Sequence, residues 1–341
     1  MSLVVVDADV LGRRRTGDET YVRNLLRALP SPAAAAGLRV AAVTRHPELV
    51  PDGVEAIELA ARSQELRMAW TLPRALRRLG AALVHTQYAL PLRCPCPAVV
   101  TIHDLSFEHG LMGARDRFVF RQVVPRAARG AARILTVSER TKRDLVEQYH
   151  LRPERVVVTP NGVDPAFAQA GGLAADTAPP ASYALAVGAI QDRKNPLAAL
   201  AAAREAGLEL VVVGPTKDER VAAELRSGGA RLEGYVPTER LAELYRGAAC
   251  LVQASRHEGF GLPVVEAMAS GTPVVTVSDP ALMEVAGDAA VVVEDGMLAE
   301  GIARALAERE RLVAAGLERA RGFSWEATAR ATVRVYLEAL G

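Results

Sequence analysis

The stretch HEGFGLPVVEAM, residues 257–268, holds two glutamates, Glu258 and Glu266, with seven residues between them. The apolar run AACLVQAS precedes it and is typical of a buried strand in a parallel sheet. Pro263 suits the first turn of a helix that ends near Gly271. The two acids therefore bracket a glycine loop between the carboxyl end of a strand and the start of a helix, where open α/β sheets bind ligands.

The chemistry of this loop points to an anionic ligand. A helix N-terminus offers free N–H groups and the positive end of its dipole to a group such as a diphosphate. The alternative is that Glu266 only complements the helix dipole while Glu258 is solvated. The spacing favours a ligand site over this alternative.

The bulk composition bounds the architecture and excludes several classes of protein. With 341 residues, half of them hydrophobic, the chain is longer than one core normally serves, so two domains are expected. No apolar run approaches a membrane span, and MSLVVVDADV is typical of a first strand rather than a signal peptide. The sequence has no cluster of His, Cys or Asp with the spacing of metal ligands, and no nucleophile elbow, Walker loop or full dinucleotide fingerprint. It also lacks the alternation of basic and aromatic residues that is typical of nucleic-acid binding. Free thiols in a cytoplasmic protein are expected for Cys94, Cys96 and Cys250.

The charge is unevenly spread. Residues 1–165 carry a net charge of +7 and the remainder −6, which gives the overall +1. A basic first half suits an anionic partner or a membrane surface, although it could equally be a solvated face. Six of its arginines lie in residues 115–133, RDRFVFRQVVPRAARGAAR, together with several apolar residues. This pattern favours a helix with a core-facing stripe, with a membrane-surface helix as the alternative.

Short β-branched runs alternate with helical patterns along the chain, which predicts two doubly wound, Rossmann-like α/β domains that face a cleft. An Ala-, Gly- and Pro-rich linker over residues 166–182 separates a first domain, 1–165, from a second, 183–323. The apolar pattern of residues 324–341 predicts an amphipathic helix, which is expected to pack back on the first domain. The predicted strands are LVVVDA, LRVAAVT, ALVHT, AVVTIHD, RILTVS and RVVVTP, then YALAVGAI, LELVVVGP, ARLEGY, ACLVQAS, TPVVTVS and AAVVVE.

A second candidate stretch is GAIQDRKN, residues 188–195, which follows the first strand of the second half. It places Arg193 and Lys194 side by side before a predicted helix. Lysine is rare in this chain, so a lysine in a loop suggests that a compact point charge is required there. The two cations could hold a diphosphate and offset its developing charge. A solvated turn is the alternative.

Two stretches of the first half also end or follow predicted strands. VVTIHD, residues 99–104, places His103 and Asp104 at a carboxyl end that faces the ligand crevice. Asp104 could instead cap the next turn, and His103 could be an ordinary partly buried histidine. TGDETYVRNLL, residues 16–26, offers one glycine, Gly17, for a phosphate loop before a helix, although a local helix cap is equally consistent.

Taken together, these residues resemble the retaining glycosyltransferases of the GT4 family, which have the GT-B fold, and look closest to bacterial mannosyltransferases. SRHEGFGLPVVEAMASGTPVV looks like the family's E-x7-E signature. TPNGVD, GAIQDRKN, VVVGP and FSWEATA match further family segments in the expected order. The resemblance therefore runs along nearly the whole chain.

The resemblance implies a role for each matching residue of the second half. Glu266 would bind the ribose hydroxyls of a nucleotide, and Glu258 would bind hydroxyls of the donor sugar. Arg193 and Lys194 would bind the diphosphate and stabilise it as it leaves. Further contacts with the donor would come from Gly188, Gly259, Phe260, Gly261 and Leu262.

In the first half, the resemblance places His103 over the sugar and Asp104 near the acceptor hydroxyl, and it brings Gly17 beside the donor. The family's first loop usually carries two or three glycines close together. Here RRRTGDETY has Gly17 alone, followed by two acids. The loop is therefore also expected to face the acceptor.

The implied reaction moves a hexose from a nucleotide-diphosphate sugar to a hydroxyl of a glycan or lipid-linked acceptor, with the anomeric configuration retained. GDP-mannose is the first expected donor and UDP-glucose the second. Neither a metal nor a cofactor is expected, nor is a nucleic-acid partner. The predicted location is cytoplasmic, with peripheral contact at the inner face of the membrane through the basic first domain. Alternatives are a sugar-nucleotide epimerase of the same fold and a non-catalytic sugar-nucleotide-binding subunit.

Overall fold

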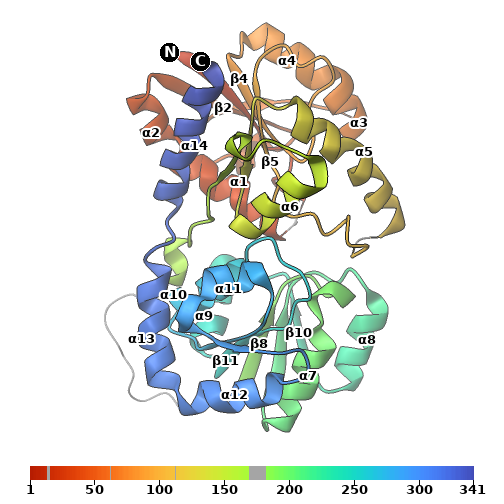
Figure 1. The fold of residues 1–341 in the computed structure, drawn as a ribbon, viewed down its shortest axis with the longest axis vertical. Helices are drawn as coiled ribbons and strands as arrows, with labels where there is room; N and C mark the ends of the chain where they lie inside the picture. The colour runs from red at the N-terminus through yellow and green to blue at the C-terminus, as the bar shows by residue number, and fades with distance from the viewer. Residues whose placement is uncertain (14–15, 62, 112, 169–181) are drawn as a thin grey trace. The chain divides into compact units, whose positions relative to one another are not determined.

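The computed structural model describes residues 1–341 except 14–15, 62, 112 and 169–181. The described chain forms two compact units, each built around one parallel sheet with helices on both sides (Figure 1). The first unit comprises Met1–Gly162 and Trp325–Gly341, and the second comprises Val163–Ser324. The predicted fold class of two doubly wound α/β domains is confirmed.

In the described part of the first unit, seven parallel strands follow the order β3-β2-β1-β4-β5-β6-β7. Strand β1 is apolar on both faces because helices cover both of them, and its Val5 pairs with Ala41 on one side and Val84 on the other. The strands are β1 (Ser2–Asp7), β2 (Leu38–Thr44), β3 (Glu55–Glu58), β4 (Leu83–Gln87), β5 (Ala98–Thr101), β6 (Arg133–Thr136) and β7 (Val156–Val158).

The helices of the first unit begin and end where local chemistry dictates. At the start of α6, for example, the Ser138 hydroxyl accepts a hydrogen bond from the main-chain N–H of Thr141, and the helix ends at His150 with a left-handed φ of 53°. The helices and helical turns are α1 (Thr16–Ala28), α2 (Pro30–Ala35), η1 (Pro47–Leu49), α3 (Gln64–Leu66), η2 (Arg67–Thr71), α4 (Leu72–Leu79), α5 (Ala114–Gly130), α6 (Glu139–Tyr149), η3 (Pro153–Arg155) and α14 (Trp325–Leu340).

In the residues described for the second unit, six parallel strands follow the order β10-β9-β8-β11-β12-β13. All six strands correspond to predicted ones: β8 (Tyr183–Val187), β9 (Glu209–Val213), β10 (Arg231–Gly234), β11 (Cys250–Gln253), β12 (Val274–Val277) and β13 (Val291–Val293). The helical elements are η4 (Pro165–Phe167), η5 (Asp192–Lys194), α7 (Pro196–Glu205), α8 (Glu219–Ser227), α9 (Thr238–Arg246), α10 (Leu262–Ala269), α11 (Pro280–Ala286), η6 (Gly287–Ala289), α12 (Leu298–Ala307) and α13 (Arg309–Ala320).

The C-terminal helix α14 belongs to the first unit, where it lies beside α1 and α2 (Figure 1, blue against red). The Trp325 and Tyr336 side chains of this helix are buried. The Tyr336 hydroxyl lies 2.7 Å from Nδ1 of His85, a residue of β4 whose Nε2 lies 2.7 Å from the Thr101 hydroxyl. Burial lowers the pKa of His85 to about 3, so this bridge between helix and sheet is made by a neutral imidazole.

The segment that follows the first unit differs from the predicted linker, residues 166–182. Phe167, in the turn η4, is buried in the second unit, and its ring centroid lies 5.6 Å from that of Tyr245. The second unit therefore begins at Val163, earlier than residue 183. The rest of the predicted linker, residues 169–181, lies outside the described residues.

The chain is helical without interruption over residues 64–79, but the helix is irregular, because the π-helical turn η2 joins α3 to α4. Pro73 has no N–H to donate to the carbonyl of Ala69, so a regular α-helical ladder cannot pass this point. The widened turn also lets Arg67 point into the unit, where it is 1% exposed. Two short elements, β3 and α2, were not predicted.

Candidate functional site

The predicted site residues of the second half lie at the topological switch point of the second sheet. The strand order reverses between β8 and β11, which are hydrogen-bonded neighbours. The loop after β8 carries residues 188–195, and the loop after β11 carries the stretch that begins at His257. The carboxyl ends of two parallel strands thus bring together segments that are more than 60 residues apart in sequence, in the crevice where such sheets bind ligands.

Glycines at the ends of two strands make room for the first loop. Gly188 and Gly214 both have left-handed φ angles, 142° and 143°. A Cβ atom on Gly214 would lie 2.1 Å from the main-chain oxygen of Gly188, and one on Gly188 would lie 3.3 Å from Cε of Lys194. Gly188 is therefore needed so that the stem of Lys194 can lie across the end of β8.

The two predicted cations and Glu258 form one cluster. Lys194 Nζ donates a hydrogen bond to Glu258 Oε1 at 2.5 Å. Arg193 Nη1 donates to the carbonyl of His257 at 2.6 Å and lies 3.5 Å from Glu258 Oε2. Asn195, which follows the turn η5, has a left-handed φ of 50° and turns the chain into α7 directly after both cations.

Gln253 is a member of this cluster that the sequence analysis missed. Its Nε2 donates to Glu258 Oε1 at 2.7 Å and lies 3.0 Å from the Ser255 hydroxyl. The side chain is 2% exposed. A polar residue that ends the otherwise apolar strand CLVQ is the signal that could have found it.

The cations determine the charge of Glu258. Burial alone would raise the pKa of this carboxyl, but Lys194 and Arg193 outweigh that effect and lower the pKa to about 2. Glu258 is therefore ionised at neutral pH, and the three side chains together carry one positive charge. A cluster with this charge attracts an anion that can compete with Glu258 for the two cations.

The loop between the glutamates is shaped for close approach to the start of α10. Gly261 caps the helix with φ 104°, and a Cβ atom there would lie 2.6 Å from Leu282. The buried ring of Phe260 packs against Phe323, with centroids 5.7 Å apart, and holds the loop in place. The structure therefore brings Gly259, Phe260, Gly261 and Leu262 to the N-terminus of α10, after Glu258.

Glu266 lies in α10 in a different environment. It is 7% exposed, and its Oε2 accepts a hydrogen bond from the Tyr245 hydroxyl at 2.9 Å. No cation among the described residues forms an ion pair with it. Burial raises the pKa of Glu266 to about 7, opposed by the Tyr245 hydrogen bond and reinforced by Asp164. This carboxyl has unused acceptor capacity and suits a neutral, hydroxyl-bearing group.

We expect Glu266→Gln to stabilise the protein at pH 8 and to have little effect on stability at pH 4.5. The folded pKa of about 7 lies above the ordinary 4.5, so folding takes up a proton between these pH values. Wild-type stability therefore falls as pH rises through this window, by on the order of 3 kcal/mol. Calorimetry at both pH values measures the difference, with exposed Glu318→Gln as the control. An equal change in Tm at pH 4.5 and pH 8 would contradict the raised pKa.

His103 and Asp104 belong to the first unit and follow β5. The imidazole of His103 is buried, with Nε2 3.2 Å from the Gln87 side-chain oxygen and its ring 4.7 Å from that of Tyr21. Burial lowers the pKa of His103, with Asp18 and Asp104 opposing, so the ring is neutral at pH 7. Asp104 Oδ1 accepts from the N–H of Ser106 at 2.9 Å, which is the capping arrangement considered as its alternative.

Gly17 lies in the first turn of α1 and not in the expected glycine loop. Among the described residues, and apart from its chain neighbours and the backbone of its own helix, no atom lies within 4 Å of the position of a Cβ at Gly17, so these residues leave room for a side chain there. The acid at residue 19 has a local role: Glu19 accepts hydrogen bonds from the N–H of Gly12 and from Arg23, at 3.1 and 2.7 Å. Glu19 of the following helix thus ties the described part of this loop to α1.

The basic helix α5 has the core-facing stripe that was predicted for it. Val124, Ala127 and Ala128 are buried in the core of the first unit. Phe118 and Val119, in the N-terminal half of the helix, are 68% and 43% exposed. The core-facing stripe is therefore present, and an exposed apolar patch lies beside the arginines.

Neither a cluster of metal ligands nor a membrane-spanning helix occurs in the described part of the chain. His, Cys, Asp and Glu side chains form no group of three or more there that could hold a metal ion. Across the same residues, every helix is too short or too polar to cross a bilayer.

Comparison with known proteins relates both halves of the chain to sugar transfer. The model of Glycosyltransferase Family 4 matches residues 15–167, and that of Glycosyl transferases group 1 matches residues 177–319. O-antigen chain mannosyltransferase B of Escherichia coli is 31% identical over 299 residues, which cover 79% of this chain and 77% of that protein. A D-inositol 3-phosphate glycosyltransferase of Frankia alni is 31% identical over 313 residues, covering 76% and 74%.

Among solved structures, sucrose-phosphate synthase from Thermosynechococcus elongatus superposes with a TM-score of 0.79. The match covers 99% of this chain and 98% of that one, at 21% identity. At this identity the similarity concerns the fold alone.

Proposed function

Because this chain belongs to the group 1 and family 4 glycosyltransferases, we propose that it transfers a hexose with retention of anomeric configuration. The chain is an enzyme of the transferase class that uses a nucleotide sugar as donor. The proposed donor is GDP-mannose first, since O-antigen chain mannosyltransferase B is among its relatives, and UDP-glucose second. The proposed acceptor is a hydroxyl of a glycan or lipid-linked saccharide.

The observation that carries the proposal is the cluster of Arg193, Lys194 and Glu258 at the start of α10. A diphosphate bound there would take Lys194 and Arg193 as counter-charges and would meet the positive end of the helix dipole. In the transfer, the bond between the anomeric carbon and the diphosphate oxygen breaks, and the acceptor oxygen bonds to that carbon on the same face. The leaving phosphate oxygen accepts the acceptor's proton, so no separate protein base is required.

The two glutamates would bind different parts of the donor. Glu266 has a carboxyl beside Tyr245 and no described cation, which suits hydrogen bonds from a ribose diol. Glu258 is ionised and held by Lys194, so it can accept from a sugar hydroxyl next to the carbon that becomes cation-like. His103 and Asp104 are proposed to contact the transferred sugar and the acceptor.

The proposed mechanism needs no metal, because the two cations and the helix dipole supply the charge that a metal would. Peripheral contact with an anionic membrane through the exposed Phe118 and Val119 of α5 and the neighbouring arginines is also proposed. The cytoplasmic location stays a prediction.

A panel of nucleotide sugars tests this function. We expect one of them to stabilise the protein by about 2.7 kcal/mol at one hundred times its Kd, and to be hydrolysed slowly without acceptor. We expect EDTA to leave this hydrolysis intact. The same protein with Arg193→Met serves as the control that should lose the stabilisation, because a diphosphate contact is removed.

The products distinguish the alternatives. Release of the nucleoside diphosphate and free sugar supports a transferase, whereas conversion into another nucleotide sugar would indicate an epimerase. Stabilisation with no turnover under any condition would indicate a non-catalytic subunit. Activity that EDTA abolishes and a divalent ion restores would contradict the metal-free mechanism.

A further inference from the structure

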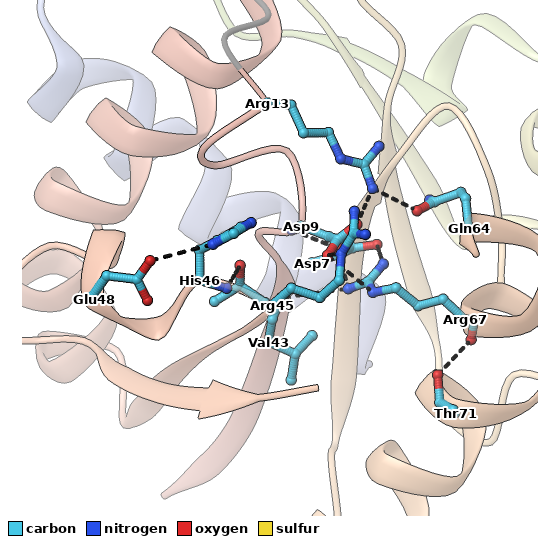
Figure 2. A network of polar contacts seen from close by, with 11 residues as sticks. Asp7, Asp9, Arg13, Val43, Arg45, His46, Glu48, Gln64, Arg67 and Thr71 are labelled. Carbon is cyan, nitrogen blue, oxygen red and sulfur yellow. Dashed lines mark hydrogen bonds and ion pairs between the residues drawn. The ribbon is translucent and has the colours of Figure 1, made fainter. Parts of the chain in front are cut away.

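A network of buried charges lies at the carboxyl end of β1 in the first unit (Figure 2). Arg67 donates to both oxygens of Asp7, with Nη1–Oδ2 and Nη2–Oδ1 distances of 2.6 and 2.5 Å. Arg45 donates to both oxygens of Asp9 at 2.8 and 3.0 Å, and Arg13 also bonds to Asp9. Burial opposes ionisation of Asp9, but these arginines outweigh it and hold its pKa below the ordinary value. Charge-assisted bonds thus fix both Arg45 and the turn η2, which begins at Arg67.

Arg45, the member of this network that bonds to both oxygens of Asp9, also lines an open groove of about 610 Å³. This volume lies in the range of ligand sites in proteins. Arg45 follows β2 and Glu58 ends β3, so the groove lies at the carboxyl edge of the sheet, on the side where such sheets bind ligands. Its lining side chains are Arg45, Glu58, Leu66, Trp70 and Thr71, with two alanines between them.

Trp70 is unusual because it is held in place although it is exposed. Trp70 is 56% exposed, and the Arg74 guanidinium lies 4.5 Å from the centroid of its ring. The π-helical turn that carries it is anchored from inside by Arg67. A large apolar ring is thus presented to solvent on an anchored turn, with the Arg74 guanidinium against it, in a groove that Arg45 and Glu58 also line.

We propose that this groove binds a saccharide unit of the acceptor, stacked on the indole of Trp70. The inference rests on the proposed function and assigns a binding site to its acceptor. A pyranose presents an apolar face of C–H groups, which matches an aromatic ring, and hydroxyls around its rim, which match charged donors and acceptors. Arg45 offers donors, and the exposed Glu58 has no hydrogen-bond or ion-pair partner among the described residues.

The tryptophans themselves provide the test. The chain has two, and they differ sharply: Trp70 is 56% exposed, whereas Trp325 is 4% exposed. Iodide should therefore quench the fluorescence of Trp70 and leave that of Trp325. We expect a saccharide from a panel of mannose, glucose, galactose and N-acetylglucosamine disaccharides to protect Trp70 from iodide. In Trp70→Phe, iodide should no longer quench the fluorescence, and the saccharide should therefore have no protective effect.

Variants then separate stacking from general exposure. Saturation-transfer NMR with the protecting disaccharide should show Trp70→Ala binding about tenfold more weakly, the loss typical of an aromatic contact. Trp70→Phe should retain most of the affinity because it keeps a ring. Leu337→Ala, which removes an exposed apolar side chain of the same unit outside the groove, should bind like wild type.

The outcomes distinguish this proposal from the proposed function. Failure of every disaccharide to protect Trp70 overturns the groove assignment, as does protection by dihexanoylphosphatidylglycerol alone. Protection by GDP instead of a saccharide overturns it too, since the groove would then hold the donor. Wild-type hydrolysis of a nucleotide sugar is measured separately, so donor turnover without protection contradicts only the acceptor site.

Discussion

Lys194→Met should lower the turnover number by about 10²–10³-fold, the usual loss when one stabiliser of developing charge is removed. Methionine keeps an apolar stem over Gly188 but has no charge to offer a leaving diphosphate. Lys194→Arg should recover only part of the rate, because a guanidinium is larger and aims its donors differently. Steady-state kinetics with varied donor measures the effect.

The change also leaves the buried Glu258 with Arg193 as its remaining cation, so stability has to be separated from catalysis. Lys194→Met combined with Glu258→Gln should regain stability in thermal unfolding without regaining turnover. Arg311→Met, which breaks an exposed pair with Glu308, is the matched control and should keep full activity. Wild-type turnover in Lys194→Met would remove Lys194 from the site.

Arg67→Met should destabilise the first unit by about 3–5 kcal/mol, the range for breaking a buried ion pair by removing one partner. Arg67 is 1% exposed and Asp7 is 8% exposed, so the remaining carboxylate cannot be solvated without rearrangement. Both tryptophans, Trp70 and Trp325, lie in the first unit, so urea unfolding followed by their fluorescence reports on that unit.

The double variant Arg67→Met with Asp7→Asn should regain much of the loss, since no buried charge is then left unpaired. Arg133→Met is the surface control: it removes a pair with Glu338 in the same unit and should change stability by about 1 kcal/mol or less. Equal destabilisation by Arg67→Met and Arg133→Met would show that the buried network does not support the unit.

Strands that are buried on both faces could be predicted from sequence, because their runs of Val, Leu and Ala leave little ambiguity. The edge strand β3 could not, since its sequence EAIE is largely exposed and alternates charges with apolar residues. The π-helical turn at residues 67–71 could not be predicted either. The helical periodicity of that stretch is real, and only the buried partner Asp7 explains why Arg67 points inward.

The cluster around Glu258 was predictable in part. Its spacing from Glu266 and its place after a strand indicated a site, and the structure brings Arg193 and Lys194 to it. The opposite pKa shifts of Glu258 and Glu266 were not predictable, because they depend on which partners each carboxyl meets after folding. Gly17 shows the reverse case, in which a local pattern suggested a loop but the chain is already helical.

The helix α14 bears on the order in which a nascent chain can complete its two units. The first unit is built from two separate stretches, and all of the second unit is synthesised between them. Until residue 336 leaves the ribosome, His85 lacks the hydroxyl of Tyr336, and the core beside it lacks Trp325. The second unit, which is continuous in sequence, is complete before the first. The first unit can therefore reach its full set of contacts only after all of the second unit has been synthesised.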